Sequence, residues 1–400
     1  MPNIFVHGPF LQKGRRSPAL AYRPFPCRKA ATLLHPIRHL YFHIPFCPKL
    51  CPYCCFYVET GARNKTTAFL DALLREVADA GQRFALRPET IYFGGGTPSA
   101  LSVEQLDYLL GGLRARLDLS ALTEWTFEVN PATVRPEKAR LLHAAGVTRI
   151  SLGVQSWDDT LLKTLGRVHD AAQAEKTYAI LRAAGLENIN IDLMFAVPGQ
   201  TPAQWAATLA KTIALQPEHI SSYCLTYEQD TAYFRQLQLG TFKPDDDRDA
   251  DLFETTMDAL TAAGFAQYEI SNYARPGRES VHNFAYWRGA DYLGFGPSAF
   301  STVGLRRWQA LPDTATYTSR ILAGASVEHF VEELSPATRA GEIAAFAIRT
   351  RDGLASADLA RWTEPLREFH ELGFLEHRGD RVVLTRRGKL MADAVAEAFV

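Results

Sequence analysis

Acidic residues are absent from the start of this sequence: the first is Glu59, and residues 1–38 are rich in Pro, Arg and Lys. Over the whole chain, 43 Lys and Arg against 44 Asp and Glu give a formal net charge of −1. Such a chain has no overall attraction to nucleic acid or to an anionic membrane. No apolar run approaches the roughly 20 residues of a transmembrane helix, and no secretory apolar segment is present. We therefore expect a cytoplasmic protein without a nucleic-acid partner.

Cysteines are few as well, six in 400 residues, but four of them fall between Cys47 and Cys55. Disulfide-rich domains spread their cysteines along the chain, whereas a tight group in a chain of this size is typical of ligands kept reduced in the cytosol. Cys27 lies apart, in the basic segment 1–38, and has no evident partner. We expect this segment to be a poorly ordered extension; contact with a membrane surface and an organellar transit peptide are the alternatives.

The cysteine group stands in the stretch His39–Phe56, HLYFHIPFCPKLCPYCCF, where Cys47, Cys51 and Cys54 have C-x3-C-x2-C spacing. Three thiolates on one loop suit a 4Fe–4S cluster, whose fourth iron then has no protein ligand and is open to a small molecule. A structural zinc site is the alternative, but it needs four ligands and usually takes them from paired C-x2-C knuckles. Cys55 directly follows Cys54 and is expected to point away from the same metal. The spacing therefore favours a cluster held by the first three cysteines.

Strand-like runs alternate with helical runs from residue 40 onward, and the stretch 67–84 repeats its apolar residues at helical spacing. Alternation over about 190 residues implies parallel strands joined by right-handed crossovers. Six units are too few for a closed eight-stranded barrel, so we predict an α/β fold with an open, partial (β/α)6 barrel. The predicted strands are 40–44, 90–93, 125–129, 149–154, 188–194 and 219–225, and the predicted helices are 67–84, 103–117, 136–145, 171–184 and 202–215.

Candidate ligand-binding residues follow the predicted strands, at the edge where the functional groups of such barrels gather. Strand 90–93 is followed by GGGTP, residues 94–98, whose glycines let backbone N–H groups approach a ligand. Glu128 and Gln155 end the next two strands, and the Glu128 carboxylate is suited to the α-ammonium of an amino acid. Asp192 stands in a strongly apolar strand, where a carboxylate is costly without a partner. That partner is either a ribose diol or, as a structural ion pair, Arg167.

These motifs together resemble the radical S-adenosylmethionine (SAM) superfamily. YFHIPFC and CPYC resemble the branch that contains anaerobic coproporphyrinogen III oxidase (dehydrogenase) and the HemW-type haem chaperones, and the likeness covers most of the chain beyond the first forty residues. The resemblance implies a 4Fe–4S cluster on Cys47, Cys51 and Cys54, with SAM bound at the open iron. It also implies a set of residues that contact SAM: Tyr41, Gly95, Gly96, Thr97, Glu128, Gln155, Arg167 and Asp192.

A second motif, HNFAYW, places His282, Tyr286 and Trp287 on one face of a helix, at i, i+4 and i+5. From the pattern alone, a histidine beside two large aromatic residues is more often a packed core element than a ligand. HN-x2-YW nevertheless resembles the motif that distinguishes HemW-type proteins from their relatives. The resemblance implies that these residues bind haem, with the His282 imidazole as an axial ligand and the aromatic rings against the macrocycle.

The resemblance thus implies a haem chaperone that binds a cluster, SAM and haem and delivers haem to client haemoproteins. The alternatives are an oxygen-independent coproporphyrinogen III dehydrogenase, which decarboxylates propionates by radical chemistry, and a radical-SAM methyltransferase of the same branch. The dehydrogenase tends to carry a further cysteine at the position of Phe56, and its absence favours the chaperone. Cys55 and the basic extension depart from the chaperone pattern. No residue is assigned a catalytic role, and cleavage of SAM and binding of SAM alone both stay open.

The implied partners are haem or porphyrin, client haemoproteins and a reductant such as flavodoxin or ferredoxin. Peripheral membrane contact and a homodimer stay open. Near the C-terminus, two short strand patterns flank Arg378-Gly379-Asp380 between helical runs, which predicts a winged-helix-like module. Its basic cluster of Arg386, Arg387 and Lys389 is modest, so packing is favoured over nucleic-acid binding. We predict four parts: a basic extension (1–38), the radical-SAM partial barrel with the cluster and SAM (39–245), an extension with HNxxYW (246–334) and the C-terminal module (335–400).

Overall fold

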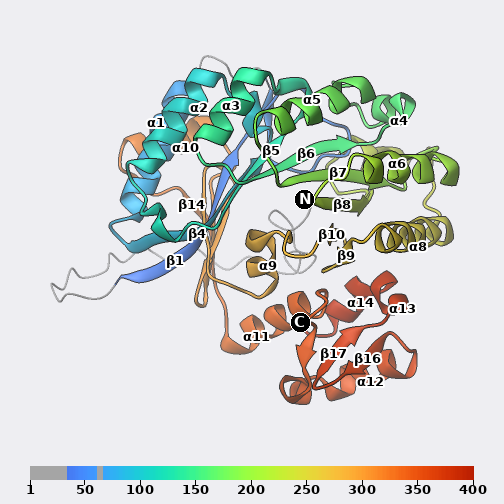
Figure 1. Ribbon diagram of the computed structural model, residues 1–400. Coiled ribbons are helices and arrows are strands. Elements are labelled where there is room, and N and C mark those ends of the chain that lie inside the picture. The colour runs from blue at the N-terminus through green and yellow to red at the C-terminus, as the bar shows by residue number, and fades with distance from the viewer. Residues whose placement is uncertain (1–33, 61–65) are drawn as a thin grey trace.

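A computed structural model of the chain describes residues 34–60 and 66–400. The predicted basic extension therefore lies almost wholly outside the described residues, as does Cys27. The largest sheet has nine strands in the order β11-β1-β4-β5-β6-β7-β8-β10-β9. Helices α1, α2, α3, α5 and α6 cover one face of this sheet, and helix α9 and the C-terminal elements lie on the opposite side (Figure 1).

The six predicted strands are all present, parallel and adjacent in the sheet, which confirms the predicted open α/β arrangement. They are β1 (His35–Ile44), β4 (Phe84–Gly95), β5 (Glu124–Val129), β6 (Arg149–Gln155), β7 (Ile189–Phe195) and β8 (His219–Cys224). The predicted helices between them are α1 (Thr66–Ala80), α2 (Val103–Arg114), α3 (Pro136–Ala144), α5 (Ala171–Ala183) and α6 (Pro202–Ala214).

Two details differ from the predicted pattern. The helix expected to reach Phe84 ends at Ala80, because Phe84 already pairs with His35 as the first residue of β4. A seventh parallel strand, β11 (Leu293–Phe295), extends the sheet beyond β1. Three residues are too short a run for hydrophobic periodicity to distinguish a strand from a loop.

The two faces of the sheet differ in polarity. On β6, Ile150, Leu152 and Val154 point outward into the main hydrophobic core and have no exposed surface. Arg149 and Ser151 alternate with them and point to the inner face. Strands of parallel sheets that are buried on both faces are usually apolar throughout. The polar inner face therefore marks where the barrel leaves space for ligands.

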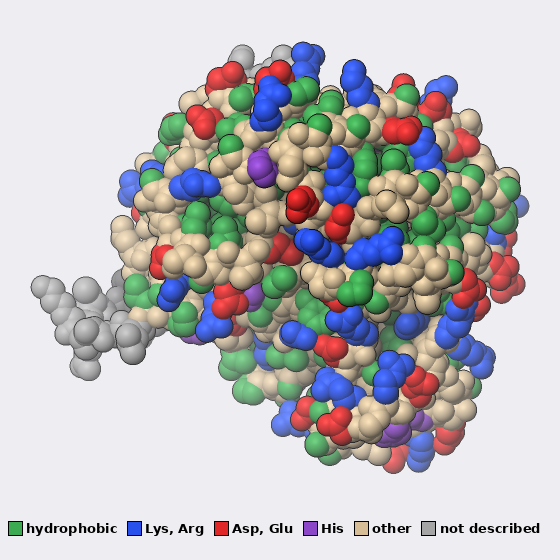
Figure 2. All heavy atoms as spheres, viewed as in Figure 1, with side chains coloured by type: hydrophobic (Ala, Val, Ile, Leu, Met, Phe, Trp, Pro, Cys, Tyr) green, Lys and Arg blue, Asp and Glu red, His purple; other side chains and the backbone are tan. Residues whose placement is uncertain are grey.

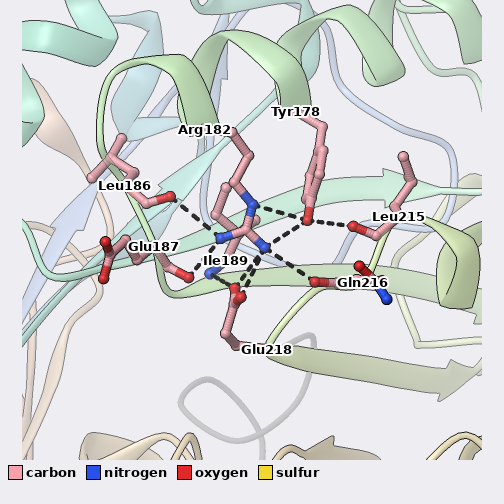
Figure 3. Close-up of polar contacts among 8 residues, drawn as sticks. All are labelled: Tyr178, Arg182, Leu186, Glu187, Ile189, Leu215, Gln216 and Glu218. Atoms are coloured by element: carbon pink, nitrogen blue, oxygen red, sulfur yellow. Dashed lines mark hydrogen bonds and ion pairs between the residues drawn. The ribbon is translucent and has the colours of Figure 1, made fainter.

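The starts of β7 and β8 are held by Arg182 of α5 (Figure 3). Its guanidinium donates to the carbonyl oxygen of Glu187 at 2.6 Å and pairs with the Glu218 carboxylate at 2.7 Å. Glu218 in turn accepts the backbone N–H of Ile189, the first residue of β7, at 3.0 Å. One side chain thus ties the segments that precede two neighbouring strands, including the strand that carries Asp192.

We expect Arg182→Ala to lower the free energy of unfolding by about 1–3 kcal/mol, because it leaves the Glu218 carboxylate without its cationic partner and removes the donor of the Glu187 and Gln216 carbonyl groups. The matched control is Arg140→Ala. Arg140 pairs with Glu137 at 3.6 Å, and both side chains are more than 60% exposed (64% and 63%), so its removal should change stability by less than about 0.5 kcal/mol. Urea unfolding of the three proteins measures both values; equal effects of the two substitutions would contradict the role of Arg182.

Smaller elements complete the barrel region and its inner side. They are β2 (Phe46–Cys47), β3 (Glu59–Thr60), α4 (Asp159–Thr164), α7 (Ala232–Gln238), α8 (Asp246–Ala262), β9 (Ala266–Gln267), β10 (Asn272–Ala274), α9 (Val281–Trp287) and α10 (Thr314–Leu322). A separate antiparallel sheet consists of β12 (Phe300–Val303), β13 (Arg306–Ala310) and β14 (Glu328–Glu333).

The C-terminal elements have a second hydrophobic core of their own. They are α11 (Pro336–Ala347), β15 (Leu354–Ala355), α12 (Thr363–Glu371), β16 (Leu375–Arg378), β17 (Arg381–Leu384), α13 (Arg386–Leu390) and α14 (Ala392–Glu397). The predicted hairpin is present, and Gly379 at its turn has φ +65°. That conformation favours glycine.

The basic cluster of this region makes packing contacts. Arg386 pairs with Asp258 of α8 at 2.6 Å, and Lys389 donates to the Gln267 side chain at 2.8 Å. On the face shown in Figure 2, positive and negative side chains are interspersed over the C-terminal elements. Both observations favour the predicted packing role over nucleic-acid binding. Among the described helices, none has the length and apolar character needed to cross a membrane.

Candidate cofactor-binding site

A single cavity collects most of the predicted site residues at the carboxyl ends of the parallel strands. They come from the cysteine loop, the end of β4 and the turn after it, the ends of β5 and β6, the middle of β7 and the loop after α4. The predicted residues that line it are Cys47, Cys51, Cys54, Gly95, Gly96, Thr97, Glu128, Gln155, Arg167 and Asp192. Residues far apart in the sequence thus meet at the carboxyl edge of the sheet, where we predicted the ligand-binding residues.

The cysteine loop runs from β2 to β3 and carries four free, half-buried thiols. The Cys47 sulfur lies 3.2 Å from the Thr97 hydroxyl, and Arg167 approaches the Cys51 sulfur at 3.7 Å. A turn closes where the Cys54 N–H donates to the Cys51 carbonyl at 3.1 Å. Cys55 lines the same cavity. The loop therefore presents four thiols to one cavity, beside a hydroxyl and a guanidinium. Three of them have the predicted spacing, and the fourth, Cys55, lines the cavity although it was expected to point away.

Burial raises the pKa of the Cys47 thiol, and that of Cys54 to about 12. Binding of metal requires thiolates, so loading this loop with a cluster releases protons. Within the part of the chain that the structure describes, no three His, Cys, Asp or Glu side chains converge as the ligands of a single ion do. A cluster makes a different demand, because its cysteines bind different irons. The donor set fits a cluster better than zinc.

The glycine turn after β4 is fixed against the cysteine loop. The Gly96 N–H donates to the Ile44 carbonyl at 2.9 Å, and the Thr97 N–H donates to the Phe46 carbonyl at 2.8 Å. Gly95 has φ +98°, and a Cβ atom there would lie 2.4 Å from the His43 ring. A Cβ atom on Gly96 would lie 2.7 Å from the Ile44 carbonyl oxygen. Only glycine allows this approach, which explains the residue type at both positions.

Glu128 of β5 contributes a carboxyl group to the cavity. Tyr92 of β4 donates its hydroxyl hydrogen to the Glu128 carboxylate at 2.8 Å. Burial raises the pKa of Glu128 to about 7. A carboxyl group with this pKa gains most from a cationic ligand, because the ligand stabilises its charged form.

Asp192 of β7 is 7% exposed and lines the cavity. Its two oxygens accept hydrogen bonds from Ser151 at 2.9 Å and from the Asn190 amide at 2.7 Å. Arg167 instead donates to the Gly153 carbonyl at 2.9 Å. The alternative of an Asp192–Arg167 ion pair is therefore wrong: the hydrogen-bond partners of the carboxylate are neutral groups, and the carboxylate lines the cavity.

Gln155 ends β6 in a strained conformation. Its φ of +70° lies in the region that favours glycine, and the pairing of β6 with β7 shifts by one residue between Gly153 and Gln155. Such bulges re-aim a side chain, and strain of this kind clusters at functional sites. The side chain lines the cavity as a result.

Tyr41 lies one layer deeper than the other predicted SAM residues and is absent from the described lining of the cavity. It is 4% exposed, and its hydroxyl lies 3.1 Å from Nδ1 of His43. His43 is a residue that the sequence did not single out; its Nε2 contacts the Tyr57 carbonyl oxygen at 2.8 Å and so ties β1 to the cysteine loop. Burial lowers the pKa of His43 to about 4, so the ring is neutral at physiological pH.

Other cavity residues were also missed: Asn130, Ser151, Tyr223 and Cys224. Ser151 had a signal, because it shares the inner face of β6 with Gly153 at strand spacing. Cys224 is the last residue of β8, as Gln155 is of β6, but a single cysteine is not a motif that indicates a function.

The HNFAYW residues form helix α9, as predicted, but they lie outside this cavity. His282 is 2% exposed; its Nδ1 lies 2.7 Å from the Thr90 hydroxyl and its ring centre 5.2 Å from that of Tyr92. Tyr286 packs against the cluster of Tyr41 and Tyr92 as well. The rings of Tyr286 and Trp287 also contact Phe346 in α11, with ring centres 5.1 and 5.8 Å apart. Helix α9 is thus held between the polar inner face of the sheet and the C-terminal elements.

Comparison with known proteins gives consistent results. The model of the radical SAM superfamily matches residues 41–211. The haem chaperone HemW of Mycobacterium tuberculosis is 38% identical over 372 residues, which cover 90% of this chain and 94% of that protein. HemW of Escherichia coli is 34% identical over 374 residues, with coverages of 90% and 97%. Coproporphyrinogen III oxidase (HemN) from E. coli has a similar structure, with a TM-score of 0.80 over 92% of this chain and 91% of that one, at 23% identity. The last likeness concerns the fold, and it confirms the predicted radical-SAM architecture.

Proposed function

Because the chain belongs to the HemW family of radical SAM proteins, we propose that it is a haem chaperone, which binds haem and passes it to client haemoproteins. Family membership implies a 4Fe–4S cluster and SAM as cofactors. The observation that carries the proposal is the pairing of two features: near-complete coverage by HemW relatives and an intact HNFAYW helix. We expect it to act in the cytoplasm, where its cysteines stay reduced.

The residues of the cavity divide between the two cofactors. Cys47, Cys51 and Cys54 hold the cluster, which when bound supplies one-electron chemistry and an open iron. Glu128 binds the α-ammonium group of SAM, and Asp192 accepts hydrogen bonds from the ribose hydroxyls. The glycine turn and Gln155 form the walls beside them, and Arg167 fixes the cysteine loop. For haem, we assign His282 as the iron ligand and Tyr286 and Trp287 as the aromatic contacts.

The raised pKa of Glu128, about 7, predicts a pH dependence of SAM binding. Below this pKa the carboxyl group of the free protein is protonated, and SAM must displace a proton to bind as an ammonium–carboxylate pair. The affinity should therefore rise with pH, by roughly fivefold to tenfold between about pH 6 and pH 7.5, and fall again as the α-amino group of SAM loses its proton near pH 8. Calorimetry measures the dissociation constant at each pH.

Glu128→Gln is the matched variant for this experiment, because the amide has the same shape without a titrating group. We expect weaker SAM binding and loss of the rise between pH 6 and 7.5. If the variant keeps the same rise as the wild type, another group controls it.

A coproporphyrinogen III dehydrogenase is the competing function, and haem transfer distinguishes the two. The anaerobically reconstituted protein is loaded with haem, separated from excess and mixed with an apo-haemoprotein such as apomyoglobin. A chaperone transfers haem to the acceptor, seen as the Soret spectrum of the acceptor. Absence of haem uptake, together with SAM cleavage stimulated by coproporphyrinogen III, would assign the dehydrogenase instead.

A further inference from the structure

A continuous chain of buried hydrogen bonds runs beneath the cavity from Asp192 toward helix α9. The Asn190 amide nitrogen lies 2.7 Å from Asp192, and the Asn190 oxygen lies 2.7 Å from Nδ1 of His219. Nε2 of His219 lies 2.8 Å from the Tyr268 hydroxyl. That hydroxyl accepts the backbone N–H of Ser280, at 3.3 Å. Ser280 is the residue that precedes α9 and caps its first turn.

The chain continues into the backbone of α9. Ser280 also contacts the Glu124 carboxylate at 3.3 Å, through its hydroxyl. The same carboxylate accepts the N–H groups of Val281 at 2.8 Å and His282 at 3.0 Å. The first turn of α9 is therefore positioned by groups at the far end of the hydrogen-bond chain that starts at Asp192.

Along the hydrogen-bond chain from Ser280 to Asp192, each group donates to the next one toward Asp192. A carboxylate only accepts, so Asn190 turns its NH₂ group to Asp192 and its oxygen to His219. His219 must then donate from Nδ1, which leaves Nε2 as an acceptor for the Tyr268 hydroxyl. Burial lowers the pKa of His219 well below its usual value, in keeping with this neutral tautomer. Asn190 also donates to Ser151 at 2.7 Å and accepts from Ser221 at 3.1 Å, in the same orientation. The polar groups from Asp192 to Tyr268 therefore have one consistent orientation.

The chain is shielded from water along its whole length. Asn190, His219, Tyr268 and Ser280 are each 1% exposed or less. In such surroundings a hydrogen bond is stronger than in water, and a broken one is costly, so neighbouring groups change together. These conditions make the chain suited to carry a change at Asp192 to α9.

Haem ligation requires movement of the same helix. His282 is 2% exposed, and its ring lies beside Tyr92, with Nδ1 against the Thr90 hydroxyl at 2.7 Å. A ring in this position is too deeply buried to meet the iron of a porphyrin. On the proposed function, haem therefore binds the arrangement in which α9 has moved away from the sheet.

We propose that SAM and haem bind antagonistically, and that Tyr268 and His219 are the positioning residues that couple their two sites. SAM binds Asp192 and stabilises the ordered chain, which holds α9 against the sheet and keeps His282 buried. Haem binds the released helix and disorders the chain. Coupling between two ligands is reciprocal, so haem weakens SAM binding by the same factor. This inference rests on the proposed function.

The test measures the dissociation constant of haem, by Soret titration of the cluster-loaded protein, without SAM and with saturating SAM. We expect SAM to weaken haem binding in the wild type by at least about fivefold, the lower end of common coupling strengths. Tyr268→Phe removes one hydroxyl group from the middle of the chain and should bring this ratio close to one, while haem and SAM each still bind.

The control is Tyr273→Phe. Tyr273 is equally buried and close to Tyr268 in the sequence, and its hydroxyl has no hydrogen-bond partner among the described residues. We expect this variant to keep the wild-type ratio. An equal loss of coupling in both variants would indicate general loosening and overturn the proposal.

Three further outcomes separate the coupling from the function. If the wild type binds haem and SAM independently, the coupling is overturned and the chaperone function stands. If antagonism persists in Tyr268→Phe, it arises by another route, such as direct overlap of the ligands, and the hydrogen-bond chain is overturned as its cause. If the wild type binds no haem, the proposed function itself fails.

Discussion

Alanine at Cys47, Cys51 or Cys54 should abolish the broad brown absorbance of the anaerobically reconstituted protein, whereas Cys55→Ala should retain it. The three thiols share one loop and one cavity and have the spacing of cluster ligands. A cluster that already has one open iron does not tolerate the loss of a further protein ligand. We expect loss of nearly all bound iron and sulfide in each of the three variants.

Cys224→Ala is the matched control, because Cys224 lines the same cavity from β8, outside the cysteine loop. Iron and acid-labile sulfide, measured chemically, give the cluster content independently of any activity. A requirement for Cys55 equal to that for Cys54 would contradict the ligand assignment, and full cluster content in Cys47→Ala would contradict the site.

Asp192→Ala should weaken SAM binding by roughly 10-fold to 150-fold, since a hydrogen bond to a charged group contributes about 1.5–3 kcal/mol. The carboxylate lies in the cavity with Ser151 and Asn190 as its protein partners. Its oxygens therefore face the cavity, where the ribose hydroxyls can donate to them. Cluster content should be unchanged, because Asp192 is not a ligand.

Asp107→Ala, an exposed residue of α2, is the control for general effects of removing an aspartate. Equilibrium dialysis with labelled SAM measures binding without any turnover. Unchanged affinity in Asp192→Ala would return Asp192 to a structural role within the hydrogen-bond chain.

Local sequence signals predicted the strands and the cavity edge well. Alternation of apolar and polar residues is a property of a strand itself, and parallel strands end at one edge, so Glu128 and Asp192 could be placed together before the structure was known. The GGGTP turn and the cysteine spacing are likewise local. Each depends on residues within one segment.

The depth of a side chain cannot be predicted in this way. Tyr41 and His282 belong to recognised motifs, yet both are buried because of contacts with strands and helices that are distant in the sequence. His282 meets Thr90, 192 positions earlier. The hydrogen-bond chain could not be predicted for the same reason. Asn190 and His219 meet through the pairing of β7 with β8, and Tyr268, which directly follows β9, reaches them because β10 lies between β8 and β9 in the sheet.

The central claim is that this chain binds haem through the HNFAYW helix, and a titration tests it most directly. Haem is added anaerobically to the cluster-loaded wild type, to His282→Ala and to His329→Ala, a control at an exposed histidine, and the Soret band is recorded. We expect stoichiometric uptake by the wild type and by His329→Ala, and a lost or shifted band in His282→Ala. Absence of uptake by the wild type, or an identical spectrum in His282→Ala, would contradict it.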